Sequence, residues 1–139
     1  MPLFESLAWT LSFSRKSTGL TYSMRIVLPL AEYAFVDQSK IVDYLLSMTH
    51  PDGQAKARFF VSFGFQPNQW KQLADALRSV GTSNPVCASV ESSHGTRYVV
   101  DGLLTTPINR SPRVRTVWIL EAGGAGPRLV TAYPLEDRL

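Results

Sequence analysis

The sequence predicts an α+β domain in which two to three N-terminal helices pack on a four-stranded antiparallel sheet. Apolar residues recur at helical spacing between residues 37 and 80. From residue 86 onward, apolar and polar residues alternate with the period of two that is typical of strands. All helical segments precede all strand segments, an order that favours α+β over an alternating α/β fold.

The composition supports one globular domain. Of 139 residues, 45% are apolar and 18% are charged, which is sufficient for an ordinary core. No apolar run approaches the roughly 20 residues that span a bilayer, so we expect no membrane partner. Cys87 is the single cysteine, which excludes an intrachain disulfide and a cysteine zinc site and fits a reducing, cytoplasmic location.

Residues 1–23 differ in composition from the rest of the chain. We expect them to form an N-terminal extension to a single domain at 24–139. Their apolar positions would share one face of a short helix, which the segment 15–19 then breaks. Glu5 comes early and the basic pair comes late, the reverse of a secretory signal. The extension is interpreted either as a mobile segment, with a real start at Met24, or as an accessory helix.

The first predicted helix follows a short β-branched run. Pro29 keeps that run, residues 25–30, from being a central strand. The helix begins after Asp37, a candidate N-cap, and ends near the turn sequence at 50–53.

Two further helices are expected before the sheet. The second covers about 54–62 and ends at Gly64, and the third covers about 69–80 and ends at Gly81 as a C-cap. The inward faces of the three helices are formed by Ile41, Tyr44, Leu45 and Met48, by Ala57, Phe60 and Val61, and by Trp70, Leu73, Leu77 and Val80.

The strands are separated by clear turn signals. They are expected at 86–90, 98–104, 113–120 and 128–133. A hairpin link at 92–95, a polar loop at 105–112 and a glycine-rich turn at 123–127 connect them.

The faces of the last two strands decide which side chains are accessible. Thr116 and Trp118 point one way, and Thr131 and Tyr133 share a face of the next strand. We pair these four residues on one side, which gives an open face rich in hydroxyls and aromatic rings. The opposite register, which would bury Trp118 and Tyr133, stays open.

Common cofactor and metal motifs are missing. The glycine-rich segment 123–126 precedes a strand, not a helix, and so indicates a hairpin turn and not a phosphate loop. Neither His50 nor His94 has an acidic cluster at ligand spacing, so no metal or other cofactor is expected. Cys87, in mid-strand, is interpreted as a small buried thiol.

His50 and Lys56 are the side chains that could serve a reaction. The His50 imidazole exchanges protons near neutral pH. The Lys56 ammonium group stabilises a developing oxyanion. Structural roles stay open beside these: capping of the first helix for His50 and a solvated helix position for Lys56. His94 is expected to be only a polar turn residue.

Arginines gather ahead of and within the last two strands. The segment 108–131 contains a single acidic residue, Glu121, and four arginines: Arg110, Arg113, Arg115 and Arg128. It is therefore more basic than the whole chain, whose net charge is only +3. The cluster is interpreted as phosphate-binding, or else as charge that protects a sheet edge.

Distinctive segments, in order, carry a family resemblance. They are Leu28–Glu32, Asp37 with Lys40, Asp43–Leu46, His50–Gly53, Lys56–Phe60, Thr116–Ile119 and Pro127–Pro134. Together they resemble the bacterial domain-of-unknown-function family 6883 over about residues 25–135. The family has no settled activity, so the resemblance implies a fold and not a reaction.

A looser resemblance suggests an activity. Helices followed by a four-stranded antiparallel sheet that ends in Thr-x-Tyr-Pro resemble the RNase toxins of the barnase–EndoU–colicin–RelE type. That group cleaves RNA without metal by means of scattered polar side chains. The resemblance implies that His50 and Lys56 lie on the helical side of a site whose sheet side is lined by Thr116, Thr131 and Tyr133.

The leading hypothesis is therefore a metal-independent endoribonuclease, the toxin of a toxin–immunity pair. RNA supplies its own nucleophile, the 2′-OH, so the protein need supply only a base, an acid and cationic support. Its partners would be RNA and a small immunity or antitoxin protein. The residues expected to contact substrate are Arg58, Arg113, Trp118 and Arg128.

Two other functions stay open. One is a non-catalytic module that binds a partner protein through the sheet face and its basic rim. The other is an RNA-binding domain without catalysis, in which Trp118 and Tyr133 stack on bases.

Overall fold

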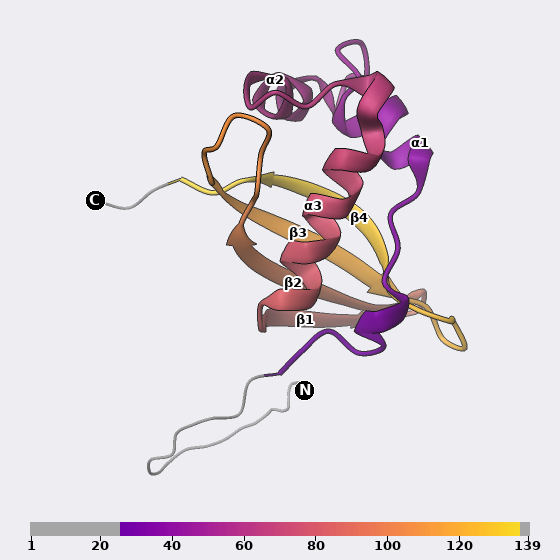
Figure 1. Cartoon of the computed structure of the whole chain (residues 1–139). Helices are drawn as coiled ribbons and strands as arrows, with labels where there is room; N and C mark the ends of the chain where they lie inside the picture. The colour runs from indigo at the N-terminus through magenta and orange to yellow at the C-terminus, as the bar shows by residue number, and fades with distance from the viewer. Residues whose placement is uncertain (1–25, 137–139) are drawn as a thin grey trace.

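The computed structural model describes residues 26–136 and confirms the α+β class (Figure 1). The predicted extension, residues 1–23, lies outside this range. The helical elements come first: η2 (Ala31–Tyr33), α1 (Gln38–Lys40), η3 (Ile41–Leu45), α2 (Gln54–Ser62), η4 (Pro67–Gln69) and α3 (Trp70–Ser83). The strands follow: β1 (Val86–Ser92), β2 (Gly95–Leu103), β3 (Arg113–Leu120) and β4 (Arg128–Pro134).

The four strands form one antiparallel sheet in the order β1-β2-β3-β4. In Figure 1, α3 crosses one face of this sheet, whereas α2 lies beyond the edge formed by β4. The helices thus cover one face and one edge.

The core lies between α3 and the sheet. Leu73, Leu77 and Val80 are buried, which confirms the predicted stripe of α3, and Trp70 is half-buried beside them. Gly81 was expected to end this helix, but α3 continues to Ser83. A Cβ at Gly81 would lie only 2.4 Å from Cζ2 of Trp118, so the glycine allows the indole to pack against the helix backbone.

The first predicted helix is shorter than its apolar spacing suggested. Three residues of α1 pass into the π-helical turn η3, which ends at Leu45, and the Asp37 side chain makes no capping bond. Met48, expected on the inward face, is 47% exposed because the helix ends before it. Val61 of α2 is likewise exposed rather than inward-facing.

Arg78 attaches the N-terminal segment to α3. Its Nε donates a hydrogen bond to the carbonyl oxygen of Ala34 at 2.8 Å, and its Nη2 donates to those of Glu32 at 3.0 Å and Ala31 at 3.4 Å. A guanidinium group presents its donors in a fixed fork. One side chain therefore binds three carbonyls of this segment, of which that of Ala31 also accepts the N–H of Ala34.

The register of β3 and β4 corrects the predicted open face. Thr116 pairs with Ala132, and Arg115 pairs with Tyr133. Directly paired residues of antiparallel strands project on the same side. Thr116 and Trp118 are therefore both fully buried on the core side, and neither can contact a substrate.

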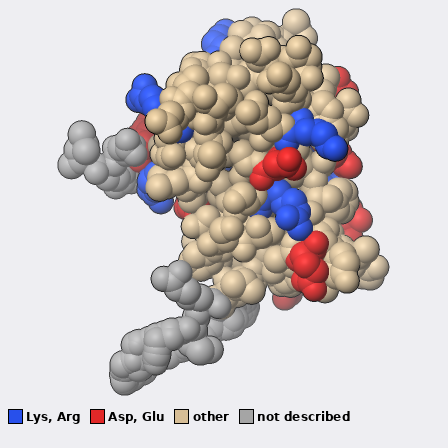
Figure 2. Space-filling model, viewed as in Figure 1, with Lys and Arg blue, Asp and Glu red and all other residues tan. Residues whose placement is uncertain are grey.

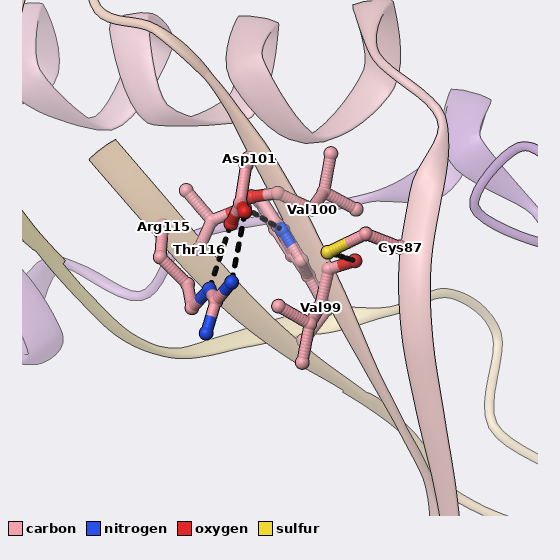
Figure 3. Close-up of polar contacts among 7 residues, drawn as sticks. Cys87, Val99, Val100, Asp101, Arg115 and Thr116 are labelled. Carbon is pink, nitrogen blue, oxygen red and sulfur yellow. Dashed lines mark hydrogen bonds and ion pairs between the residues drawn. The ribbon is translucent and has the colours of Figure 1, made fainter. Parts of the chain in front are cut away.

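The buried pair is joined by hydrogen bonds. Trp118 Nε1 donates to the Thr116 hydroxyl at 2.8 Å, and that hydroxyl donates to the Val100 carbonyl at 2.7 Å (Figure 3). These bonds satisfy the two polar side chains inside the core.

Candidate active site at the edge of the sheet

Three polar side chains from distant parts of the chain meet at the β4 edge. They are Tyr44 of η3, Lys56 of α2 and Thr131 of β4. Lys56 Nζ donates hydrogen bonds to the Tyr44 hydroxyl and, at 3.1 Å, to Thr131 Oγ1. The two hydroxyl oxygens lie 3.3 Å apart. We call these residues the Lys56 cluster.

The local backbone explains why Tyr44 and Lys56 meet. A Cβ at Gly53 would lie 2.3 Å from the Tyr44 carbonyl oxygen, so only glycine lets the start of α2 approach η3 this closely. His50 fixes the same turn, because its Nδ1 accepts hydrogen bonds from the N–H groups of Asp52 at 3.0 Å and Gly53 at 3.1 Å. His50 therefore stabilises the turn that leads into α2 and does not cap the end of the first helix.

Aromatic rings and a second cation surround the cluster. The His50 and Tyr44 rings meet edge to face, with centroids 5.0 Å apart. Lys56 Nζ lies 4.8 Å from the Tyr44 ring centroid and 5.9 Å from that of Tyr133, and Lys40 Nζ lies 5.2 Å from the Tyr44 ring. Of the predicted catalytic residues, the structure thus brings His50, Lys56 and Thr131 to Tyr44, and Tyr133 to Lys56.

The surroundings lower the pKa of the Tyr44 phenol. Partial burial acts to raise this pKa, but the hydrogen bonds from Lys56 and Thr131 and the positive charges of Lys56 and Lys40 outweigh it. Tyr44, His50, Lys56, Thr131 and Tyr133 are all half-buried. The cluster is therefore partly desolvated yet open to a ligand. It can stabilise negative charge through the ammonium group and accept a proton on the phenolate.

Tyr44 was missed by the sequence reasoning, which placed it in an apolar stripe. The signal available was its hydroxyl, because a half-buried tyrosine turns its polar end toward a partner or solvent. Nothing local in the sequence indicates that the partner would be Lys56, twelve residues later.

Beside Tyr133 on the open sheet face, Arg115 forms a two-pronged ion pair with Asp101 (Figure 3). Its Nε and Nη2 contact the two carboxylate oxygens at 2.8 and 2.9 Å. The guanidinium group lowers the pKa of Asp101, and the carboxylate raises that of Arg115. Arg115 is therefore committed to a structural partner.

Cys87 lies on this face too and is exposed, contrary to the buried position expected from the sequence. A bulge in β1 between Val86 and Ala88 turns it outward. Its Sγ contacts the Val99 carbonyl oxygen at 3.4 Å. Desolvation and the Asp101 charge raise the pKa of the thiol, which disfavours the nucleophilic thiolate.

The predicted substrate-binding arginines do not converge. Arg58 is exposed on α2, and Arg113 and Arg128 lie at opposite ends of the β3–β4 pair. Arg128 also pairs with Glu121 at 3.1 Å. On the face viewed in Figure 2, basic and acidic side chains are interspersed.

Residues 26–136, the part of the chain that the structure describes, contain neither a metal-ligand group nor a membrane-spanning helix. No three His, Cys, Asp or Glu side chains there are grouped as a metal site would require. No helix in that range has the length and apolar composition needed to cross a membrane.

Comparison with known proteins identifies the family. The model of the family described as "Domain of unknown function (DUF6883)" matches residues 27–136, most of the chain. The chain belongs to the DUF6883 family. The match covers every element of the DUF6883 fold described above, including all residues of the Lys56 cluster. No curated protein matches the sequence.

A solved structure shares the fold of this DUF6883 chain. It is a chain from a "Contact-dependent growth inhibition toxin - immunity protein complex from Klebsiella pneumoniae 342". The TM-score is 0.60 at 16% sequence identity, over 78% of this chain and 98% of that one. At this identity the likeness shows the fold alone, and function must be argued from the site.

Proposed function

We propose that this DUF6883 domain is a metal-independent endoribonuclease that acts as the toxin of a toxin–immunity pair. The observation that carries the proposal is the Lys56 cluster, with His50 and Tyr133 beside it. These groups match what RNA cleavage by its own 2′-OH requires: a proton acceptor, a fixed cation and donors that orient a phosphate.

The cluster suggests a role for each group. Tyr44, with its lowered pKa, takes the proton of the 2′-OH as the 2′-oxygen forms its bond to phosphorus. Lys56 stabilises the charge that builds on the non-bridging oxygens, while Thr131 and Tyr133 orient the phosphate. The bond from phosphorus to the 5′-oxygen breaks, and that oxygen takes a proton from solvent. The products are a 2′,3′-cyclic phosphate and a 5′-hydroxyl.

His50 has a more restricted role than sequence reasoning assigned to it. Because its Nδ1 accepts two backbone N–H bonds, the imidazole proton resides on Nε2. In the proposal, His50 positions the Tyr44 ring and donates a hydrogen bond toward the substrate.

The activity is tested with the purified full chain and total RNA in the presence of EDTA. We expect fragments that end in 2′,3′-cyclic phosphate. Lys56→Ala should lower the rate about a hundredfold or more, a typical loss for a group acting in the transition state. Lys71→Ala, which removes an exposed lysine of α3, is the matched control and should not change the rate.

If wild-type protein leaves RNA intact, the ribonuclease proposal fails and a binding module is favoured. The exposed side chains of Val90 and Leu103, each about 60% accessible, would then indicate where a partner protein binds.

The toxin role draws on the structural neighbour, whose title names a toxin and an immunity protein. We expect expression of the chain alone in bacteria to arrest growth, and Lys56→Ala to abolish the arrest. Co-expression of an immunity protein, to be sought among small acidic proteins encoded beside the chain, should restore growth. If cells that express the wild-type chain grow normally although their lysate cleaves RNA, the chain is a ribonuclease but not a toxin.

A further inference from the structure

A cavity of about 340 Å³ lies between the end of α2, the loop that joins β2 to β3 and the residues that follow β4. In Figure 1 the ribbon of that loop rises toward α2. Such a volume is at the lower end of the range for small-molecule sites. The lining residues come from three parts of the chain: Phe59, Phe63, Arg110, Ser111, Pro112, Arg113 and Leu135.

The helix and the strands that line the cavity also carry residues of the proposed active site. Phe59 of α2 and Phe63, which directly follows the helix, stand at positions i+3 and i+7 from Lys56, so the three residues lie along one side of the helix. On the sheet, Leu135 donates its backbone N–H to the Arg113 carbonyl at 3.0 Å, two residues beyond the Arg115–Tyr133 pair. Two strand residues span about 7 Å, close to the distance between successive phosphates of an RNA strand.

The lining combines aromatic rings with cations. The Phe59 and Phe63 ring centroids are 5.0 Å apart, and both side chains are half-buried. The Arg110 guanidinium lies over the Phe63 ring, 5.7 Å from its centroid. Arg110 and Arg113 are exposed at the rim.

The loop that carries Arg110 is ordered by its own hydrogen bonds. The Thr106 hydroxyl donates to the Arg110 carbonyl at 2.5 Å, and Leu104 N–H donates to the Pro112 carbonyl at 2.9 Å. The loop also packs on the end of α2. A Cβ atom at Gly64 would lie only 3.2 Å from the Pro107 side chain, so the two segments are in close contact. Arg110 is thus held beside the rings before any ligand binds.

We propose that this cavity is a nucleotide subsite, in which one base of an RNA strand stacks against Phe63 and Arg110 while Arg113 contacts a neighbouring phosphate. Single-stranded RNA is recognised by stacking of splayed bases on aromatic rings and guanidinium planes, with cations along the backbone. The inference rests on the proposed ribonuclease function. It adds that substrates carry an unpaired base next to the cleaved bond.

The test compares two labelled octamers by fluorescence anisotropy with the full chain. One is 2′-fluoro RNA, which lacks the nucleophilic hydroxyl and cannot be cleaved, and the other is an abasic strand with the same phosphates. Phe63→Ala should weaken binding of 2′-fluoro RNA about 5- to 150-fold, which is the affinity that stacking of one base on an aromatic ring contributes. Binding of the abasic strand should not change. Tyr33→Ala, at a residue 60% exposed outside the cavity, should change neither.

Arg113→Ala should weaken binding of both strands alike and reduce the salt dependence by about one phosphate contact. Phe63→Leu keeps the apolar bulk and serves if the alanine variant unfolds; it too should lower the preference for the base-containing strand. Equal binding of the two strands by wild-type protein, or an unchanged preference in both Phe63 variants, would overturn the subsite.

Failure of the subsite is distinguishable from failure of the enzyme. RNA cleavage that is indifferent to Phe63 refutes the subsite and leaves the ribonuclease standing. Base-dependent binding that requires Phe63, without any cleavage, supports the subsite and refutes the enzyme.

Discussion

Replacing Thr116 with valine keeps the shape of a fully buried side chain and removes its hydroxyl. The Trp118 N–H then has no acceptor inside the core, which costs about 1–3 kcal/mol, and the lost bond to Val100 costs about 0.5–1.5 kcal/mol. The added methyl returns about 0.8 kcal/mol. We therefore expect a net loss of about 1–3 kcal/mol, or roughly 4 °C in Tm for each kcal/mol.

A double-mutant cycle isolates this mechanism. Unfolding in urea, followed by circular dichroism, gives the cost of Thr116→Val in the wild-type chain and in a Trp118→Phe background. Phenylalanine has no N–H to satisfy, so the valine substitution should cost less there. Equal costs in the two backgrounds would refute the hydrogen-bond argument. RNA cleavage by folded Thr116→Val should match wild type, and a hundredfold loss would return Thr116 to the catalytic set.

Further expectations concern the core, the ion pair and the extension. Leu73→Ala should destabilise the protein by about 2–5 kcal/mol in urea unfolding, since Leu73 is fully buried; a loss well under 1 kcal/mol would contradict the packing of α3. The lowered pKa of Asp101 means that its pairing with Arg115 stabilises the fold above the unfolded pKa of about 3.9 and that this contribution disappears as pH falls through the lower folded value. The Tm difference between wild type and Asp101→Asn should therefore narrow from pH 6 toward pH 2, and a constant difference would contradict the linkage. A chain that starts at Met24 should keep its Tm within a few degrees, whereas insolubility would show that residues 1–23 belong to the core.

Local pattern was sufficient for most of the fold. The stripe of Leu73, Leu77 and Val80 predicted α3, and the change of period at residue 86 predicted the sheet. The register of β4 against β3 could not be predicted from the sequence, because a bulge shifts it between Val117 and Trp118. A one-residue change of register moves every side chain to the other face, which is why two residues assigned to the open face are buried.

The candidate site was predictable by residue type but not by geometry. Lys56 was singled out because an ammonium group stabilises a developing oxyanion, and Thr131 because the resemblance to RNase toxins implied it; the two side chains are in direct contact. Tyr44 was read as apolar because helical spacing reports which side a residue faces and not what its polar end touches. The π-helical turn that carries it has no sequence signature that could have placed its hydroxyl.

The fit of Trp118 against Gly81 has a consequence for how this family can vary. A helix backbone in contact with an indole leaves no spare volume, so any residue larger than glycine at position 81 requires a smaller ring at position 118, or a helix displaced from the sheet. Related sequences should therefore substitute these two positions together. Within a family of such sequences, the pair would report the spacing between α3 and the sheet without a structure of each member.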